Sequence, residues 1–140
     1  MLNNLQRFLD AQANTYETAL REVRSGHKNS HWMWFVFPQI KGLGFSEISK
    51  LYAIENAAEA KAYLEHPILG LRLREISQVL LELPVKDAHA VFGSPDDLKL
   101  KSCMTLFAAA DSEPDNIFRR VLERYFKGKE DPATLEKLAK

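Results

Sequence analysis

Apolar side chains recur at helical spacing along most of the chain. The first stripe runs from about residue 4 to residue 25 and consists of Leu5, Phe8, Leu9, Tyr16, Leu20 and Val23. Residues three and four positions apart lie on one face of an α-helix, so this stripe predicts one amphipathic helix. We expect Asn3 or Asn4 to cap its start and Gly26 to end it.

The centre of the chain carries an unbroken apolar run, Trp32 to Phe37, which contains both tryptophans of the protein. Large aromatic side chains bury roughly 150–250 Å² each, so we expect this run to anchor the core. Ser30 is the predicted N-cap of a short helix through the run, although a buried strand would show the same pattern. Because His31 and Gln39 flank the run, it could equally form the wall of a ligand pocket.

Turn and cap signals predict seven further helices after the aromatic run. Their expected first residues or caps are Ser46, Asn56, Pro67, Asp87, Ser94, Asp115 and Asp131. The predicted inward side chains include Ile48, Leu51, Tyr52, Leu69, Leu73, Leu98, Met104, Phe107, Phe118 and Leu122. No stretch alternates between polar and apolar residues, so the sequence predicts an all-α fold: a single compact multi-helix domain over residues 1–140.

Composition narrows the class of protein. Nineteen basic residues balance nineteen acidic ones, and the formal net charge of zero gives no long-range attraction to nucleic acid or to an anionic membrane. We therefore expect neither as a partner. No apolar run approaches the ~20 residues that span a bilayer. The single cysteine, Cys103, and the absence of a secretory signal favour the cytoplasm.

Four motifs together resemble one protein family. They are His31-Trp32-Met33-Trp34-Phe35 with Phe37-Pro38-Gln39; Gly42-Leu43-Gly44; Tyr63-Leu64 with His66-Pro67 and Leu69-Gly70; and Phe92-Gly93 with Asp96-Asp97-Leu98-Lys99 through Met104-Thr105-Leu106-Phe107. The chain resembles, over nearly its whole length, the bacterial domain of unknown function 1810, whose members are sometimes labelled calpastatin.

The calpastatin label does not fit the residues. Calpastatin-like inhibitors are extended, disordered repeats, whereas this chain has six prolines, no repeats and apolar stripes that require a packed core. A second, shorter pattern is loosely similar to small proteins associated with NAD and ADP-ribose, some of which are N-glycosidases. It consists of a lysine, Lys99 or Lys101, followed by Met104 and Phe107.

A polar stripe on the helix predicted after Ser94 offers candidate chemistry. Asp97, Lys101 and Thr105 recur every four residues and so share one helix face. The plain interpretation is an exposed face with a weak salt bridge. In the functional interpretation Lys101 pairs with a ligand phosphate, Asp97 accepts a hydroxyl proton or orients a water, and Thr105 donates a hydrogen bond.

The aromatic segment supplies the remaining candidates. The catalytic candidates are His31, because histidine is a common general acid or base, and Asp97. The ligand-binding candidates are Trp32, Trp34, Gln39, Lys99, Lys101 and Thr105. Cys103 has no activating motif and is expected in the core. His27 and His31 are four residues apart, but Gly26 and Asn29 oppose a continuous helix there, so neither a metal nor a cofactor is expected.

Two hypotheses of function follow. The first is a protein that binds or acts on a small phosphorylated ligand, nucleotide- or NAD-derived, in a site between the aromatic segment and the Asp97–Thr105 stripe. The second is a non-catalytic helical protein-interaction module, favoured by the neutral, all-helical composition. The first predicts a pocket lined by His31, Trp34 and Lys101 together; the second predicts a contiguous exposed apolar patch.

Overall fold

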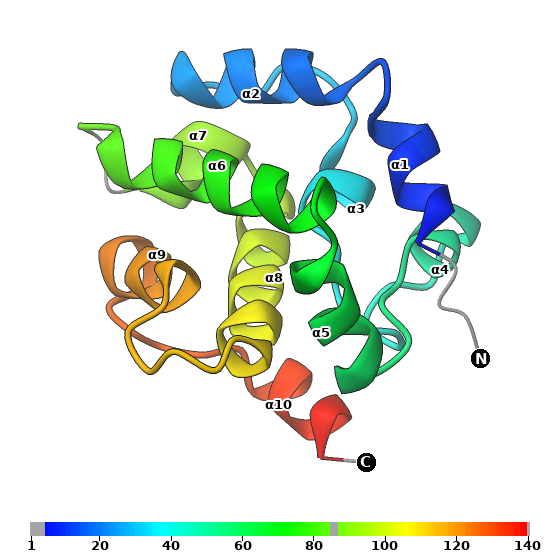
Figure 1. Cartoon of the computed structure of the whole chain (residues 1–140). Helices are drawn as coiled ribbons and strands as arrows, with labels where there is room; N and C mark the ends of the chain where they lie inside the picture. Colours follow the sequence, from blue (N-terminus) through cyan, green and yellow to red (C-terminus); the bar gives the residue numbers. More distant parts are fainter. Residues whose placement is uncertain (1–4, 85–86, 140) are drawn as a thin grey trace.

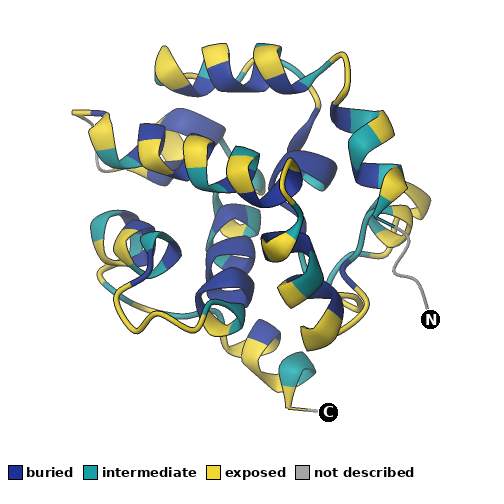
Figure 2. Ribbon diagram, in the orientation of Figure 1, coloured by how far each residue is buried: buried dark blue, intermediate teal, exposed yellow. Residues whose placement is uncertain are grey.

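The central element of the fold is a long buried helix, α8 (Asp96–Ala110). In the computed structural model, which describes residues 5–84 and 87–139, the other helices surround α8 (Figure 1). Its middle is almost entirely buried (Figure 2). The buried residues of α8 are Leu100, Ser102, Cys103, Met104, Thr105, Leu106, Phe107 and Ala108. An all-round buried stretch of this kind marks the centre of a helical core.

Nine further helices complete the described part of the chain. They are α1 (Gln6–Gln12), α2 (Tyr16–Arg24), α3 (Met33–Val36), α4 (Glu47–Leu51), α5 (Ala57–Glu65), α6 (Leu69–Glu82), α7 (Ala88–Phe92), α9 (Ile117–Phe126) and α10 (Pro132–Leu138). Among the described residues, β-pairing is limited to one isolated parallel bridge between Ile40 and Ile54. The predicted all-α class is therefore confirmed. None of the helices described here is long and apolar enough to cross a membrane.

The prediction of one helix over residues 4–25 is wrong, because the chain turns between α1 and α2. The turn follows Gln12, whose buried amide donates to the Phe35 carbonyl (2.7 Å) and to the Tyr63 hydroxyl (3.1 Å). α1 packs against α3, whereas α2 packs against α6, so the two halves of the stripe face different partners. The predicted caps Asn3 and Asn4 lie outside the described residues.

The end of α2 is as predicted. Gly26 has a φ of 79°, and its N–H donates to the carbonyl of Val23 while the His27 N–H donates to that of Glu22. This pair of bonds is the Schellman motif, in which a left-handed glycine satisfies the last carbonyls of a helix.

Two predicted caps, Ser46 and Asn56, are confirmed: their side chains accept backbone N–H groups at the starts of α4 and α5. Asp87 and Asp131, predicted as helix starts, cap α7 and α10 in the same way, one residue before each helix begins. Three others are wrong. The Ser30 hydroxyl binds Glu22 instead of capping α3. Pro95, after a cis peptide bond from Ser94, takes the cap position of α8. Buried Asn116, rather than Asp115, caps α9.

The start of α6 also differs from the prediction. The helix begins at Leu69 rather than at Pro67. The His66 ring accepts the backbone N–H groups of Ile68 (3.1 Å) and Leu69 (3.3 Å), which are among the donors left unpaired at a helix start. A side-chain acceptor three residues upstream of Leu69 therefore shifts the start of the helix past the proline.

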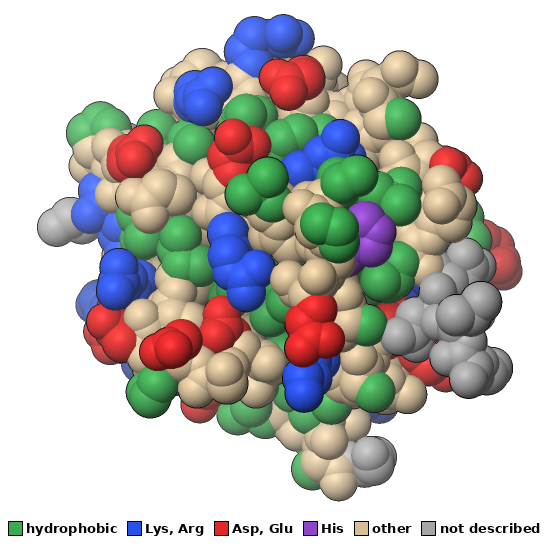
Figure 3. Space-filling view, in the orientation of Figure 1, with side chains coloured by type: hydrophobic (Ala, Val, Ile, Leu, Met, Phe, Trp, Pro, Cys, Tyr) green, Lys and Arg blue, Asp and Glu red, His purple; other side chains and the backbone are tan. Residues whose placement is uncertain are grey.

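Most predicted core positions are buried, but three are exposed. Ile48, Leu51 and Leu98 are 38%, 56% and 60% exposed, and α4 buries none of its residues. Within the aromatic run, Trp32 is fully buried, whereas Trp34 is half-buried and packs against the edge of the core. On the face shown in Figure 3, acidic and basic side chains alternate with hydrophobic ones. The departures near Trp34 and α4 coincide with the pocket described next.

Candidate functional site

A pocket of about 380 Å³ lies beside the bridge between Ile40 and Ile54. Ligand sites in proteins have volumes of roughly 300–1,000 Å³ and combine apolar walls with a few polar groups. Here three aromatic side chains form much of the wall. The lining residues are Trp34, Gln39, Ile40, Lys41, Gly42, Gly44, Phe45, Ser49, Lys50, Tyr52, Ala53 and Glu55.

Two backbone hydrogen bonds create the shape of the pocket. The Lys41 N–H donates to the Ile54 carbonyl and the Ile54 N–H donates to the Gln39 carbonyl, each at 2.8 Å. These bonds hold residues 39–41 beside residues 53–55, so the intervening chain must project outward and return. Gly42, with a φ of 100°, permits the sharp departure. The projecting segment carries α4 and forms the outer wall.

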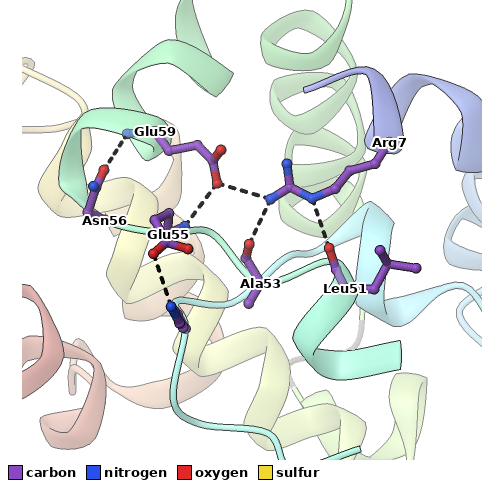
Figure 4. Close-up of polar contacts among 7 residues, drawn as sticks. Arg7, Leu51, Ala53, Glu55, Asn56 and Glu59 are labelled. Carbon is purple, nitrogen blue, oxygen red and sulfur yellow. Dashed lines mark hydrogen bonds and ion pairs between the residues drawn. The ribbon is translucent and has the colours of Figure 1, made fainter. Parts of the chain in front are cut away.

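Arg7 fixes the returning end of this segment (Figure 4). Its guanidinium donates to the carbonyls of Leu51 and Ala53, each at 2.8 Å, and lies 3.0 Å from the Glu59 carboxylate. Glu59 is buried on α5 and also accepts the Glu55 N–H at 2.9 Å. A guanidinium presents its donors in a rigid fork, so one side chain from α1 holds the pocket wall against α5.

The aromatic walls differ in how firmly they are held. The Tyr52 ring lies 5.2 Å from the Phe35 ring and 6.0 Å from the Phe8 ring, so the core fixes it. Trp34 is half-buried, while Phe45 at the rim is 86% exposed. The pocket therefore has one aromatic wall fixed by the core, one half-buried aromatic wall and one almost fully exposed aromatic side chain.

Trp34 also contacts the first turn of α8. The Lys99 ammonium lies 5.6 Å from the centre of its ring, and the exposed His31 ring lies 6.4 Å away. Asp96 pairs with Lys99 at 3.5 Å and with Lys28 at 3.0 Å. The aromatic segment and the start of α8 are thus joined through Asp96 and Lys99.

The predicted stripe on α8 does not form one polar face. The Asp97 carboxylate accepts the Leu98 N–H at 2.9 Å and lies 3.4 Å from His89. Thr105 is fully buried; its hydroxyl donates to the Lys101 carbonyl and accepts the Asp131 N–H. Thr105 therefore belongs to the core. Among the described residues no hydrogen bond or ion pair joins His31 to Asp97.

Trp32 faces the interior, away from the pocket. It is fully buried, and its indole Nε1 donates to Glu22 at 2.9 Å. Cys103 is likewise fully buried, and burial raises the pKa of its thiol, as expected for an inert core cysteine. Of the predicted ligand-binding residues, Trp34 and Gln39 line the pocket, Lys99 adjoins Trp34, and Lys101 is not among the lining residues. The catalytic candidate His31 adjoins Trp34 but does not line the pocket.

Sequence reasoning missed the remaining pocket residues, notably Phe45, Lys50 and Tyr52. The apolar spacing of the segment assigned Tyr52 to a core face, together with Ile48 and Leu51. The turn signal of Gly42-Leu43-Gly44 was visible, but it does not reveal which side chains meet after the chain returns. The bridge that brings Lys41 to Ile54 leaves no periodic trace, because it pairs single residues.

Fold and pocket define an all-helical protein in which an aromatic-walled cavity is set against the core. The chain belongs to the family described as "Protein of unknown function (DUF1810)", whose model matches residues 2–138. A solved structure with a similar fold is that of the conserved hypothetical protein Rv1873 from Mycobacterium tuberculosis. The two chains share 44% sequence identity and a TM-score of 0.94, over 98% of this chain and 97% of the other. The comparison with curated proteins gives no match.

Proposed function

We propose that the pocket binds a small phosphorylated ligand with a planar ring, of the nucleotide or NAD-derived class. The observation that carries this proposal is the composition of its wall, in which Trp34 and Tyr52 stand beside Lys41 and Lys50. Aromatic faces stack on planar rings, and such stacking contributes roughly 1–3 kcal/mol for a nucleobase. The Gln39 amide can both donate to and accept from polar atoms on the edge of the ring.

The two lysines supply the positive charge that a phosphate requires. Lys41 pairs with Glu55 at 3.0 Å, and both side chains are more than half exposed, so this pair is worth little and can yield to a phosphate. Lys50 takes part in none of the ion pairs formed among residues 5–84 and 87–139. A dianionic phosphate at the rim would therefore meet a lysine that has no competing carboxylate.

A thermal-shift panel tests the proposal. It contains four nucleosides, their 5′-monophosphates, nicotinamide mononucleotide and NAD. A ligand at 100 times its Kd stabilises the folded state by roughly 2.7 kcal/mol, which raises the melting temperature of a domain this size by about 5–10 °C. At least one phosphorylated compound is expected to do so, and its dephosphorylated partner much less.

Lys50→Gln is the matched variant. It should reduce the shift produced by the phosphorylated compound while leaving the unliganded melting temperature unchanged, because Lys50 is exposed. Lys129→Gln, an exposed lysine outside the pocket, is the control and should change neither. A panel in which no compound raises the melting temperature would overturn the proposal.

A non-catalytic interaction module is the second candidate, and one observation favours it. Phe45, Ile48 and Leu51 are all exposed within one short segment beside the pocket. This candidate expects the whole panel to be inactive. It also expects Phe45→Ser to leave stability unchanged, since the side chain is almost fully exposed. A ligand response that Lys50→Gln reduces would favour the pocket instead.

A further inference from the structure

A second cavity adjoins the first through shared walls. It has a volume of about 380 Å³, and Ile40, Lys41 and Glu55 line both cavities. Its other walls are the first turn of α5 and the end of α10, contributed by Asn56, Ala57, Ala58, Lys137 and Leu138. The exposed Lys41–Glu55 ion pair lies where the two cavities meet.

Lys137 gives the second cavity a net positive charge, because Lys41 and Glu55 balance each other. It is half-buried, and none of the ion pairs among the described residues includes it. Its side chain crosses Gly42: the Lys137 Cε would lie 3.0 Å from a Cβ at that position and its Nζ 3.3 Å. Gly42 follows Lys41 directly, so the chain brings the Lys137 ammonium close to the backbone beside the shared wall.

The charge balance of this region points to an anion. Two lysines, Lys41 and Lys137, line the second cavity against the single carboxylate of Glu55. Lowering the solvent exposure of a lysine costs free energy unless an opposite charge compensates for it. An anionic group between the two ammonium groups would provide that compensation.

We infer that the second cavity is an anion subsite, so that the ligand of this protein carries a second anionic group beyond its first phosphate. This inference rests on the proposed function. The ring would stack on Trp34 and Tyr52, the first phosphate would lie between Lys50 and Lys41, and the second would lie between Lys41 and Lys137. The ligand class is then a nucleoside diphosphate or a pyrophosphate-containing derivative, rather than a nucleoside monophosphate.

Isothermal titration with a matched series tests the subsite. The probes are the nucleoside, 5′-monophosphate and 5′-diphosphate of whichever base gives the largest thermal shift. A hydrogen-bonded contact between charged groups is stronger than one between neutral groups, so the diphosphate should bind at least about tenfold more tightly than the monophosphate. Lys137→Gln should remove most of that gain and leave monophosphate affinity unchanged.

Two further variants locate the effect. Lys41→Gln should weaken both phosphorylated probes, because Lys41 lines both cavities. Lys129→Gln should weaken neither. The anion subsite would be contradicted if the diphosphate bound no better than the monophosphate, or if Lys137→Gln weakened both equally. Either result would leave the proposal of ligand binding in the aromatic pocket unaffected. If no probe binds, both the proposed ligand binding in the aromatic pocket and the anion subsite are contradicted.

Discussion

The indole Nε1 of Trp32 donates a 2.9 Å hydrogen bond to the carboxylate of Glu22, which ties the buried aromatic anchor to α2. The same carboxylate accepts the N–H groups of Asn29 (2.7 Å) and Ser30 (3.0 Å) and the Ser30 hydroxyl. Burial by itself would raise the pKa of Glu22, but these hydrogen bonds to the charged form outweigh it and lower the pKa from 4.5 to about 2.

Because of this network, the free energy of unfolding depends on pH between about 4.5 and 2. Glu22 has a lower pKa folded than unfolded, so its contribution is complete above about pH 4.5 and is lost as the pH falls toward 2. Glu22→Gln should lower the free energy of unfolding by about 2 kcal/mol at pH 7 and flatten its decline in acid. Urea denaturation at several pH values measures both. Exposed Glu17→Gln is the control, and equal acid slopes in wild type and Glu22→Gln would contradict the assignment.

The two tryptophans should contribute unequally to stability. Trp32 is fully buried, with its ring 6.1 Å from that of Phe37 and 6.3 Å from that of Phe92. Trp32→Ala should therefore cost about 3–5 kcal/mol, as for large aromatic truncations in cores. Trp34 is half-buried, so Trp34→Ala should cost about half as much while abolishing ligand binding. Chemical denaturation separates the two, and equal losses would place Trp34 in the core.

Arg7 should affect both stability and binding without touching a ligand. Arg7→Met leaves the Glu59 carboxylate, whose side chain is 8% exposed, without the cation 3.0 Å away. Breaking a largely buried pair in this way should cost about 3 kcal/mol. The carbonyls of Leu51 and Ala53 also lose their donor, so ligand affinity should fall as the pocket wall loosens. Arg21→Met, on the exposed face of α2, is the matched control and should alter neither.

The buried stripes of the large helices could be predicted from the sequence because burial imposes a helical period. α6 buries Leu69, Leu73, Ile76 and Leu80, and α9 buries Phe118, Val121 and Leu122, all at the predicted spacing. The N-caps Ser46 and Asn56 could also be predicted, because each side chain accepts a backbone N–H only three residues further along the chain. These features depend on neighbours along the chain.

The lining of the pocket depends on contacts between distant residues, and here the predicted burial of several side chains was wrong. α4 has the spacing of an amphipathic helix, yet Ile48 and Leu51 are exposed because the bridge at Ile54 directs the segment outward. Thr105 shares a helix face with Asp97, but packing of the Asp131 loop against α8 buries it. Arg7 and Ala53 are 46 residues apart, and no local pattern indicates their contact.

Two glycine substitutions can separate backbone strain from the role proposed for Lys137. Gly26 and Gly42 both have positive φ, 79° and 100°, so Gly→Ala should cost about 1–2 kcal/mol at either position. A Cβ at Gly26 would meet no atom within 4 Å, whereas one at Gly42 would lie 3.0 Å from Lys137 Cε. The flexible lysine can move aside at little cost in stability, but its ammonium would then leave the second cavity.

Both variants should therefore lose similar stability in chemical denaturation, while their binding differs. Gly42→Ala should reduce the ratio of diphosphate to monophosphate affinity toward one, as Lys137→Gln does, and Gly26→Ala should leave that ratio unchanged. Combining Gly42→Ala with Lys137→Gln should give no further reduction, because both changes remove the same contact. A ratio preserved in Gly42→Ala would show that the ammonium acts from another position, and the second anion would then have to be assigned to a different part of the surface.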